Sequence, residues 1–147
     1  MGYSIYIGEA LPCDCKEPDC WYEKKGMMLV EAAESREAPD GGGPIGHGNW
    51  RGPSYSAWPN FTTAVGLDDL FWDKRTGLMR SHPGTVPLKP EHLRAVQEAR
   101  RKYKGTVHPD CLYPGEVSAE NKARLEWLEF WMNWALKNCK RPTFHNS

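Results

Sequence analysis

The sequence has no excess of charge of either sign, because 19 lysine and arginine residues balance 19 aspartate and glutamate residues among 147. Broad electrostatic capture of a nucleic acid polymer or an anionic membrane surface needs a basic excess. The balance therefore argues against both as partners. An anionic ligand of this chain is expected to be small and to be held by a few arginines.

Long apolar runs are also absent. No stretch reaches the roughly 18 apolar residues that a membrane-spanning helix requires. Residues 1–7 lack the basic region and the long apolar core of a secretory signal peptide. The cysteines number five, an odd count that does not suggest a disulfide framework in a chain of this size. The sequence therefore predicts a cytoplasmic protein.

Recognisable catalytic motifs are missing as well. The glycines at 41–43 are not followed by the Lys-Ser/Thr of a phosphate-binding loop, and no cysteine has a nucleophile context. Cys13, Cys15 and Cys20 could offer thiolates to zinc, but their spacing is not the two-residue knuckle of zinc sites, and ordinary loop thiols are favoured. The sequence predicts no metal and no cofactor, and it leaves open whether the chain is an enzyme.

The patterning predicts one α+β domain over residues 1–147. Residues 3–9 alternate between apolar and other side chains, as a β-strand does, and residues 27–32 read as a second strand that pairs with it. A flexible Gly-rich loop is expected over residues 35–53, since this stretch has too few apolar residues to order itself. Residues 73–77 read as a turn, with a short strand over residues 78–80. The expected fold is thus a small N-terminal antiparallel sheet, a long loop and about three helices.

The three helices follow from apolar spacing. The first is expected from residue 54 to Gly66, although Pro59 could split it, and the second from Pro90 to about residue 103. The third is expected over about residues 119–138, with Ser118 as its cap, and is rich in aromatic residues. Its apolar arc is wider than a surface helix needs, which predicts a central helix or one that exposes aromatic side chains to a ligand or partner.

Three polar and aromatic groups are candidates for a binding site. Segment 49–58 leads into a helix start, where backbone N–H groups attract anions. Segment 80–84 combines a cation, an imidazole and a tight turn, and the last helix carries indoles and an amide. Together they offer the chemistry that holds a planar base and a phosphate. The predicted ligand-binding residues are Asn49, Arg51, Ser54, Tyr55, Trp58, Arg80, His82, Trp131, Trp134 and Asn138.

The chain resembles a group of small hypothetical proteins of tailed bacteriophages and prophages. The resemblance rests on positions within residues 2–10, 49–58, 66–71, 76–92 and 125–147, and it covers most of the chain apart from residues 11–48 and 104–117. Gly52 stands where a histidine is expected in relatives. The resemblance implies a phage origin, an infected bacterial host as the location, and no established activity.

Phage origin favours a role against host defence. The first hypothesis is a small-ligand-binding protein that sequesters a nucleotide second messenger, with tryptophans stacked on a base and Arg51 and Arg80 paired with phosphate. The alternative is a protein–protein inhibitor or virion accessory protein that uses exposed aromatics of the last helix. A third is a nucleotide hydrolase with His82 as general acid or base. A homodimer is left open.

Overall fold

The computed structural model describes residues 4–10, 38–39, 48–51, 57–103 and 114–147. These residues form an α+β fold with a four-stranded antiparallel sheet, which confirms the expected fold class. The strands are β1 (Ile5–Glu9), β2 (Trp50–Arg51), β3 (Gly84–Pro87) and β4 (Pro142–Asn146), in the spatial order β2-β1-β4-β3. The strand expected over residues 27–32 lies outside the described residues.

The sheet is not an N-terminal unit, since its two central strands are β1 and β4. Ile5 pairs with Asn146 and Glu9 pairs with Pro142, so the two strands run antiparallel along their whole length. The pairing continues beyond the strands, because the backbones of Ser4 and Ser147 exchange two hydrogen bonds of 2.8 and 2.9 Å. A strand at the C-terminal end was not predicted.

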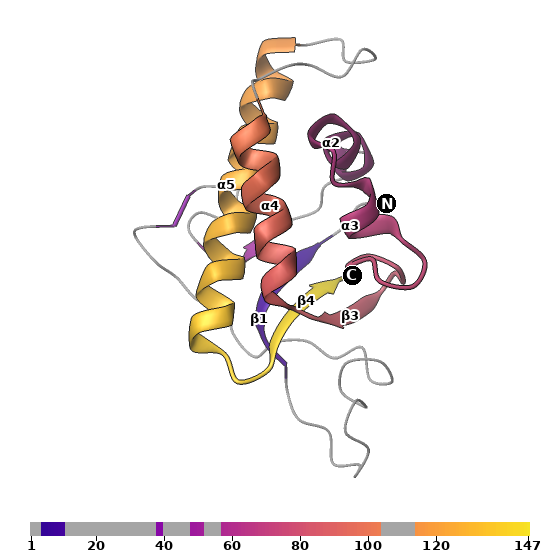
Figure 1. Ribbon diagram of the computed structural model, residues 1–147, viewed down its shortest axis with the longest axis vertical. Helices are drawn as coiled ribbons and strands as arrows, with labels where there is room; N and C mark the ends of the chain where they lie inside the picture. Colours follow the sequence, from indigo (N-terminus) through magenta and orange to yellow (C-terminus); the bar gives the residue numbers. More distant parts are fainter. Residues whose placement is uncertain (1–3, 11–37, 40–47, 52–56, 104–113) are drawn as a thin grey trace.

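Two long helices cover one face of this sheet (Figure 1). Helix α4 (Pro90–Lys102) and helix α5 (Pro114–Asn138) lie side by side and antiparallel. Helix α4 confirms the predicted second helix, and its buried residues include Val96 and Ala99 of the predicted apolar face. Helix α5 contacts α4, β1, β4 and α2, which confirms its central position.

The third predicted helix starts earlier than expected. Helix α5 begins at Pro114, so Ser118 lies inside it and is not its cap. Proline at the first turn is compatible with a helix because its missing N–H would have no helical acceptor there. The first turn of this helix is therefore marked by the proline and not by the serine.

Two shorter helices lie beside the sheet and the long helices. Helix α2 (Ala57–Val65) is continuous, since Pro59 falls in its first turn, and Gly66 follows it with a φ of +74°. This is the left-handed conformation that commonly ends a helix, and it confirms the predicted stop. Helix α3 (Asp68–Trp72) follows directly. Asp68 Oδ1 lies 2.8 Å from the Thr62 hydroxyl, which accepts a hydrogen bond from Trp72 Nε1 and so joins the two helices.

The predicted turn after α3 is confirmed, whereas the prediction of a strand over residues 78–80 is wrong. One carboxylate oxygen of Asp73 accepts hydrogen bonds from the backbone N–H groups of Arg75 and Thr76, at 2.8 and 2.9 Å. Residues 78–80 then continue in turns and bends, and extended structure begins only at β3. The backbone N–H groups of residues 78 and 79 donate to the carbonyl oxygens of Leu70 and Phe71. These hydrogen bonds hold the segment against α3, so it does not pair with a strand.

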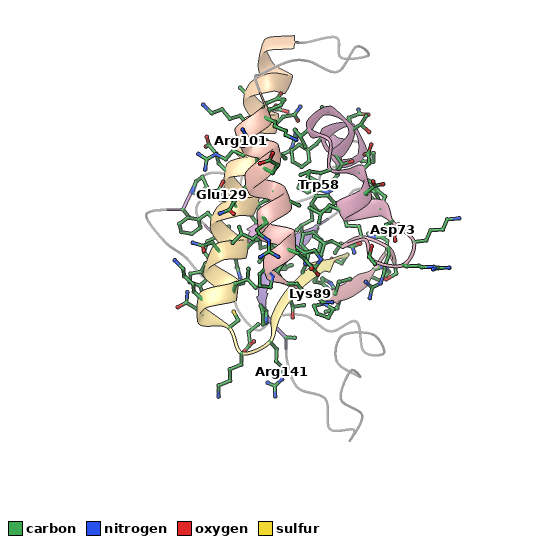
Figure 2. The ribbon with its side chains drawn as sticks, in the orientation of Figure 1. Trp58, Asp73, Lys89, Arg101, Glu129 and Arg141 are labelled. Atoms are coloured by element: carbon green, nitrogen blue, oxygen red, sulfur yellow. The ribbon has the colours of Figure 1, made fainter. Side chains whose placement is uncertain are left out.

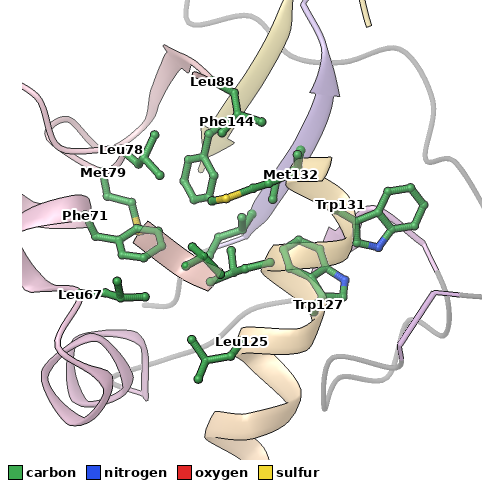
Figure 3. Close-up of a cluster of buried hydrophobic side chains, with 14 of the residues drawn as sticks. Leu67, Phe71, Leu78, Met79, Leu88, Leu125, Trp127, Trp131, Met132 and Phe144 are labelled. Atoms are coloured by element: carbon green, nitrogen blue, oxygen red, sulfur yellow. The ribbon is translucent and has the colours of Figure 1, made fainter. Parts of the chain in front are cut away.

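The hydrophobic core lies between the sheet and the helices (Figure 3). Phe144 of β4 points toward Met132 of α5. Ile5 and Ile7 of β1 and Leu125 of α5 belong to the same buried cluster. Aromatic rings extend the core toward α3 and α2. The Phe144 and Phe71 rings are 5.7 Å apart. Within the described residues, no helix combines the length and apolar character needed to cross a membrane.

Candidate functional site

The face of the sheet that points away from the helices carries a line of four polar and aromatic side chains. Tyr6 pairs with Trp50 on β2 and with His145 on β4, and His145 pairs with Thr85 on β3. Paired residues of adjacent strands point to the same face, and neighbours along a strand point to opposite faces. Because Ile5 and Ile7 face the core, these four residues face the other way. We call them the cross-strand row.

The aromatic end of the cross-strand row is the pair Tyr6 and Trp50. Their ring centroids are 5.6 Å apart with an interplanar angle of 28°, so the rings are stacked. Both side chains are half-buried. Two parallel rings at this spacing form a platform on which another flat ring can stack.

The centre of the row is a neutral imidazole. Nδ1 of His145 lies 2.9 Å from the hydroxyl oxygen of Thr85, and both residues are buried. Burial lowers the pKa of His145 to about 4, and the nearby His82 lowers it in the same direction. A neutral imidazole has one N–H donor and one bare nitrogen, so His145 can both donate and accept hydrogen bonds at neutral pH.

At the β3 edge of the sheet an amide and an imidazole are joined. The amide belongs to Asn146, which pairs with Ile5 and therefore points to the helix side and not to the row. Asn146 Nδ2 donates to the carbonyl oxygen of Ser81 at 2.9 Å, which leaves Oδ1 facing Nδ1 of His82 at 2.5 Å. Since this amide oxygen only accepts, the Nδ1 of His82 carries the proton, and Nε2 is the acceptor of the neutral ring. His82 is an exposed residue.

Two cationic side chains, Arg80 and Lys89, act on the start of α4 (Figure 2 labels Lys89). Arg80 is half-buried and precedes His82 by two residues, and Lys89 is the residue before α4. The backbone N–H of Lys89 donates to Nδ1 of His92 at 2.9 Å. Burial lowers the pKa of His92, and the charges of Lys89 and Arg80 lower it further, whereas Glu91 opposes them. Arg80 and Lys89 therefore both act electrostatically on the imidazole that stands at the start of α4.

The predicted residues of segment 49–58 fall partly on the sheet. Asn49 is buried. Its side-chain Nδ2 donates to the backbone carbonyl oxygen of Ile7 at 2.8 Å, and its backbone carbonyl oxygen accepts from the Ile7 N–H. It thus extends the pairing of β1 with β2. Arg51 is the last residue of β2 and pairs with Ile5. Ser54 and Tyr55 lie outside the described residues.

The predicted tryptophans take core positions. Trp58 is fully buried, with its ring 4.7 Å from Phe61 and 5.5 Å from Phe71. Trp131 is fully buried too, and its ring is 5.3 Å from that of the half-buried Trp134. Asn138 is exposed, and its Nδ2 donates to the carbonyl oxygen of Trp134 at 2.9 Å.

The predicted site is therefore divided by the sheet. Residues Asn49 and Arg51 stand at the β2 edge, and Arg80 and His82 come just before β3 at the opposite edge. Two strands separate these edges. Arg51 pairs with Ile5, Ile5 pairs with Asn146, and Asn146 pairs with Gly84. Trp58 and Trp131 pack in the core on the helix side, where they do not face the cross-strand row.

Sequence reasoning missed all four members of the cross-strand row. Tyr6 had a signal, because the alternation of residues 3–9 places it on the face opposite Ile5 and Ile7. Trp50 had one too, since it lies within the segment singled out around Arg51. Thr85 and His145 could not be found, because neither β3 nor β4 was predicted.

A separate pocket of about 320 Å³ lies between α4 and α5, near Pro39. Its charged residues lie close together, since Arg100 Nη1 lies 2.9 Å from Glu129 and Arg100 Nη2 lies 3.8 Å from Glu126. Among the described residues, no group of three or more potential metal-ligating side chains occurs. Cys13, Cys15 and Cys20 lie outside them.

No family model, curated protein or solved structure gives a significant match to the chain.

Proposed function

We propose that this chain is a small-ligand-binding protein, and that it sequesters a nucleotide second messenger on the cross-strand row. The observation that carries the proposal is the register, which places an aromatic pair and a neutral imidazole with a hydroxyl in one row across four strands. Arg80 and His82 precede β3, the strand at the end of this row. With strands about 4.8 Å apart, the row spans about 14 Å. A nucleotide presents a flat base, a hydrogen-bonding sugar and an anionic phosphate in the same order.

The role of each residue follows from its chemistry. Tyr6 and Trp50 stack on the base, and stacking on an aromatic side chain contributes about 1–3 kcal/mol per base. His145 and Thr85 exchange hydrogen bonds with the sugar or the base edge. The phosphate interacts with Arg80. His82 can donate to it only with Nε2 protonated as well, because its Nδ1–H is already committed to Asn146.

The neutral charge of the chain is consistent with this ligand size. A long anionic polymer would need a basic surface, whereas one small anion needs one or two cations at a fixed place. The phage resemblance adds the biological context, a protein that lowers the free concentration of a host signal. Sequestration needs slow release and no turnover, so no catalytic pair is required.

The competing functions have less support. An inhibitor that docks through the aromatics of α5 would lack two of its anchors, because Trp127 and Trp131 are fully buried. A hydrolase that uses His82 would need a second acid–base group close to it, and the neighbour that contacts its Nδ1 is an amide.

The test is a titration of the purified chain with cyclic dinucleotides and cyclic ADP-ribose isomers, followed by calorimetry and tryptophan fluorescence. One of them should bind stoichiometrically and be recovered intact after heat release. Trp50→Leu should weaken binding about 10-fold or more, since 1.4 kcal/mol is a factor of ten. The matched control is Trp72→Phe, which alters an indole on α3 that donates to the Thr62 hydroxyl and is not part of the row.

Two results would overturn the proposal. The first is no binding of any of these nucleotides by the folded protein. The second is equal loss of affinity in Trp50→Leu and Trp72→Phe, because that would mean that the variants act through stability and not through the row. Recovery of a hydrolysed ligand would instead favour the enzyme hypothesis.

A further inference from the structure

The pocket of about 320 Å³ between α4 and α5 is lined by polar, charged and aromatic side chains of both helices. Its lining residues on α5 lie three or four positions apart and therefore share one face of that helix: Glu126, Glu129, Phe130 and Asn133. Gln97 and Arg100, three residues apart on α4, line the pocket from the other helix. Two packed helices thus bring these side chains together around one cavity.

The charges in this pocket are one guanidinium and two carboxylates. Arg100 Nη1 donates to Glu129 Oε2 at 2.9 Å, which makes a hydrogen-bonded ion pair. Glu126 Oε1 lies 3.8 Å from Arg100 Nη2, which is too far for a hydrogen bond. The side chains of Glu126 and Glu129 are 30% and 26% exposed, so both carboxylates are partly removed from water. Among the described lining residues, the negative charge therefore exceeds the positive charge.

Glu126 is the carboxylate that the ion pair leaves over. The hydrogen bond with Glu129 is the largest cause that raises the pKa of Arg100, and the charge of Glu126 is the smallest. Like charges on neighbouring positions of one helix face repel each other. A carboxylate partly removed from water needs a cation or hydrogen-bond donors to replace its hydration. A ligand that supplies both would explain why a second carboxylate stands in this pocket.

The rest of the lining is suited to the same kind of ligand. The Phe130 ring packs in a T-shaped arrangement against the buried Trp131, with ring centroids 5.1 Å apart and an interplanar angle of 81°. This contact holds the ring one helical turn from Glu126, and an aromatic ring attracts a cation. The side-chain amides of Gln97 and Asn133 each offer an oxygen that accepts hydrogen bonds.

We infer that this pocket is a second binding site, for a small organic cation with an ammonium or guanidinium group. The cationic group donates to Glu126 and lies beside Phe130, and its other N–H groups donate to the amide oxygens of Gln97 and Asn133. An anion would be repelled by the two carboxylates, and a neutral ligand would leave their excess charge uncompensated. The volume is at the lower end of the range for ligand pockets, roughly 300–1,000 Å³, so the body that carries the cation is short.

Arg100 has a defined part in this site as a competitor of the ligand. Its guanidinium has the charge and the donors of the proposed ligand, and its side chain is 45% exposed. Without Arg100, both Glu126 and Glu129 would be open to an entering cation. Removal of this arginine should therefore strengthen cation binding, whereas a structural role alone for the ion pair predicts no such gain.

The experiment titrates the full chain, with no nucleotide present, with agmatine and with acetylarginine amide. Agmatine represents a free metabolite, and acetylarginine amide represents an arginine side chain of a partner protein. Binding is followed by calorimetry and by the NMR signals of the Phe130 ring. At least one probe should bind saturably and shift these signals, and the tighter probe identifies the source of the cation. Acetylcitrulline amide, the uncharged isostere of acetylarginine amide, should bind at least tenfold more weakly.

Three variants make the test specific to the pocket. Glu126→Gln preserves size and removes the unpaired charge, so it should weaken binding at least tenfold. Arg100→Gln should tighten binding at least threefold. Glu98→Gln is the matched control, because it removes a carboxylate of α4 that pairs with Arg101 and Lys102 outside the pocket, and it should change affinity less than twofold. Circular dichroism would confirm that each variant is folded.

The inference is overturned if neither charged probe moves the Phe130 signals, or if the citrulline compound binds as well as the arginine compound. It is equally overturned if Glu98→Gln loses as much affinity as Glu126→Gln, because that result would indicate diffuse attraction to acidic residues of the surface. Weaker binding by folded Arg100→Gln would also contradict it. None of these outcomes depends on nucleotide binding to the cross-strand row.

Discussion

The imidazole of His145 and the hydroxyl of Thr85 are joined across β4 and β3 by a contact of 2.9 Å between Nδ1 and Oγ1. His145 is 6% exposed, so this imidazole is held inside the protein with a pKa of about 4, far below its ordinary value of 6.5. The contact fixes the orientation of the ring on the sheet. The burial of the ring makes folding sensitive to pH.

The first prediction is a loss of stability in mild acid. Below pH 6.5 His145 becomes protonated in the unfolded chain, whereas in the folded chain it stays neutral until about pH 4. The free energy of unfolding should therefore fall as pH decreases through this window, by about 3 kcal/mol in full. His145→Gln should flatten the dependence, as measured by urea unfolding at half-unit steps from pH 7.5 to 4.

The window separates this effect from the carboxylates. The pKa of Glu98 is lowered to about 2 by the side chains of Arg101 and Lys102, and that of Asp73 is lowered by hydrogen bonds from Thr76 and Arg75. Their stabilisation is lost only as pH falls below about 4.5. His92, whose pKa is also lowered, supplies a residual slope in the same direction. A variant with an unchanged slope between pH 6.5 and 4 would show that His145 is not the source.

The second prediction compares two asparagines. Asn49→Ala removes the side-chain donor that pairs with the Ile7 carbonyl and leaves a buried acceptor unsatisfied, so it should lower the free energy of unfolding by about 2 kcal/mol. Asn138→Ala alters an exposed side chain at the end of α5 and should change it by less than about 0.5 kcal/mol. Denaturant unfolding of both variants measures the difference. Equal effects would contradict the role of Asn49 in strand pairing.

The third prediction compares two glycines. A Cβ atom at Gly77 would lie 2.5 Å from the carbonyl oxygen of Asp73 and 2.6 Å from that of Phe71, which are backbone atoms that cannot turn aside. Gly77→Ala should therefore destabilise the fold by about 2–3 kcal/mol. Gly66 has open space around it and only the strain of φ +74°, so Gly66→Ala should lower stability by about 1 kcal/mol. Thermal melts should rank them in this order, and the reverse order would be inconsistent with the turn at residues 73–77.

The fourth prediction concerns Cys139, which follows α5. Burial raises the pKa of its thiol to about 11, and the charge of Glu9 adds to the effect. Because the thiolate is the reactive form, alkylation at pH 8 should be about 100-fold slower than for an ordinary thiol. Mass spectrometry of the peptide that contains residue 139 measures the rate, with the urea-unfolded chain as control. Rapid labelling of the folded chain would contradict the burial.

Helical parts of this fold could be predicted because their signals are local. Pro90, the apolar spacing through Val96 and Ala99 and the basic residues at the end identify α4 almost to the residue. Gly66 marks the end of α2 in the same way. The alternation of residues 3–9 predicted β1 as well. The strands β3 and β4 could not be predicted, since β3 has only four residues, and residues 143–146 of β4 are all buried and show no alternation. Such strands are defined by their partners and not by their own pattern.

The candidate site was harder still to predict. In the sequence, Trp58 and Trp131 could belong either to a surface that stacks on a ligand or to the core, because a tryptophan suits both places. The structure buries both of them in the core. Only the register distinguishes them from Tyr6 and Trp50, which carry rings on the opposite face of the sheet.

The pairing of β1 with β4 has a consequence for how the protein is made. On the ribosome, β1 leaves the exit tunnel more than 130 residues before the strand that will lie beside it. During that time a central strand of the sheet lacks its main partner, and its buried isoleucines have no core to enter. Contacts so distant in sequence form slowly, and unpaired strand edges are prone to aggregate. The central pair of the sheet can therefore form only after β4 has left the ribosome.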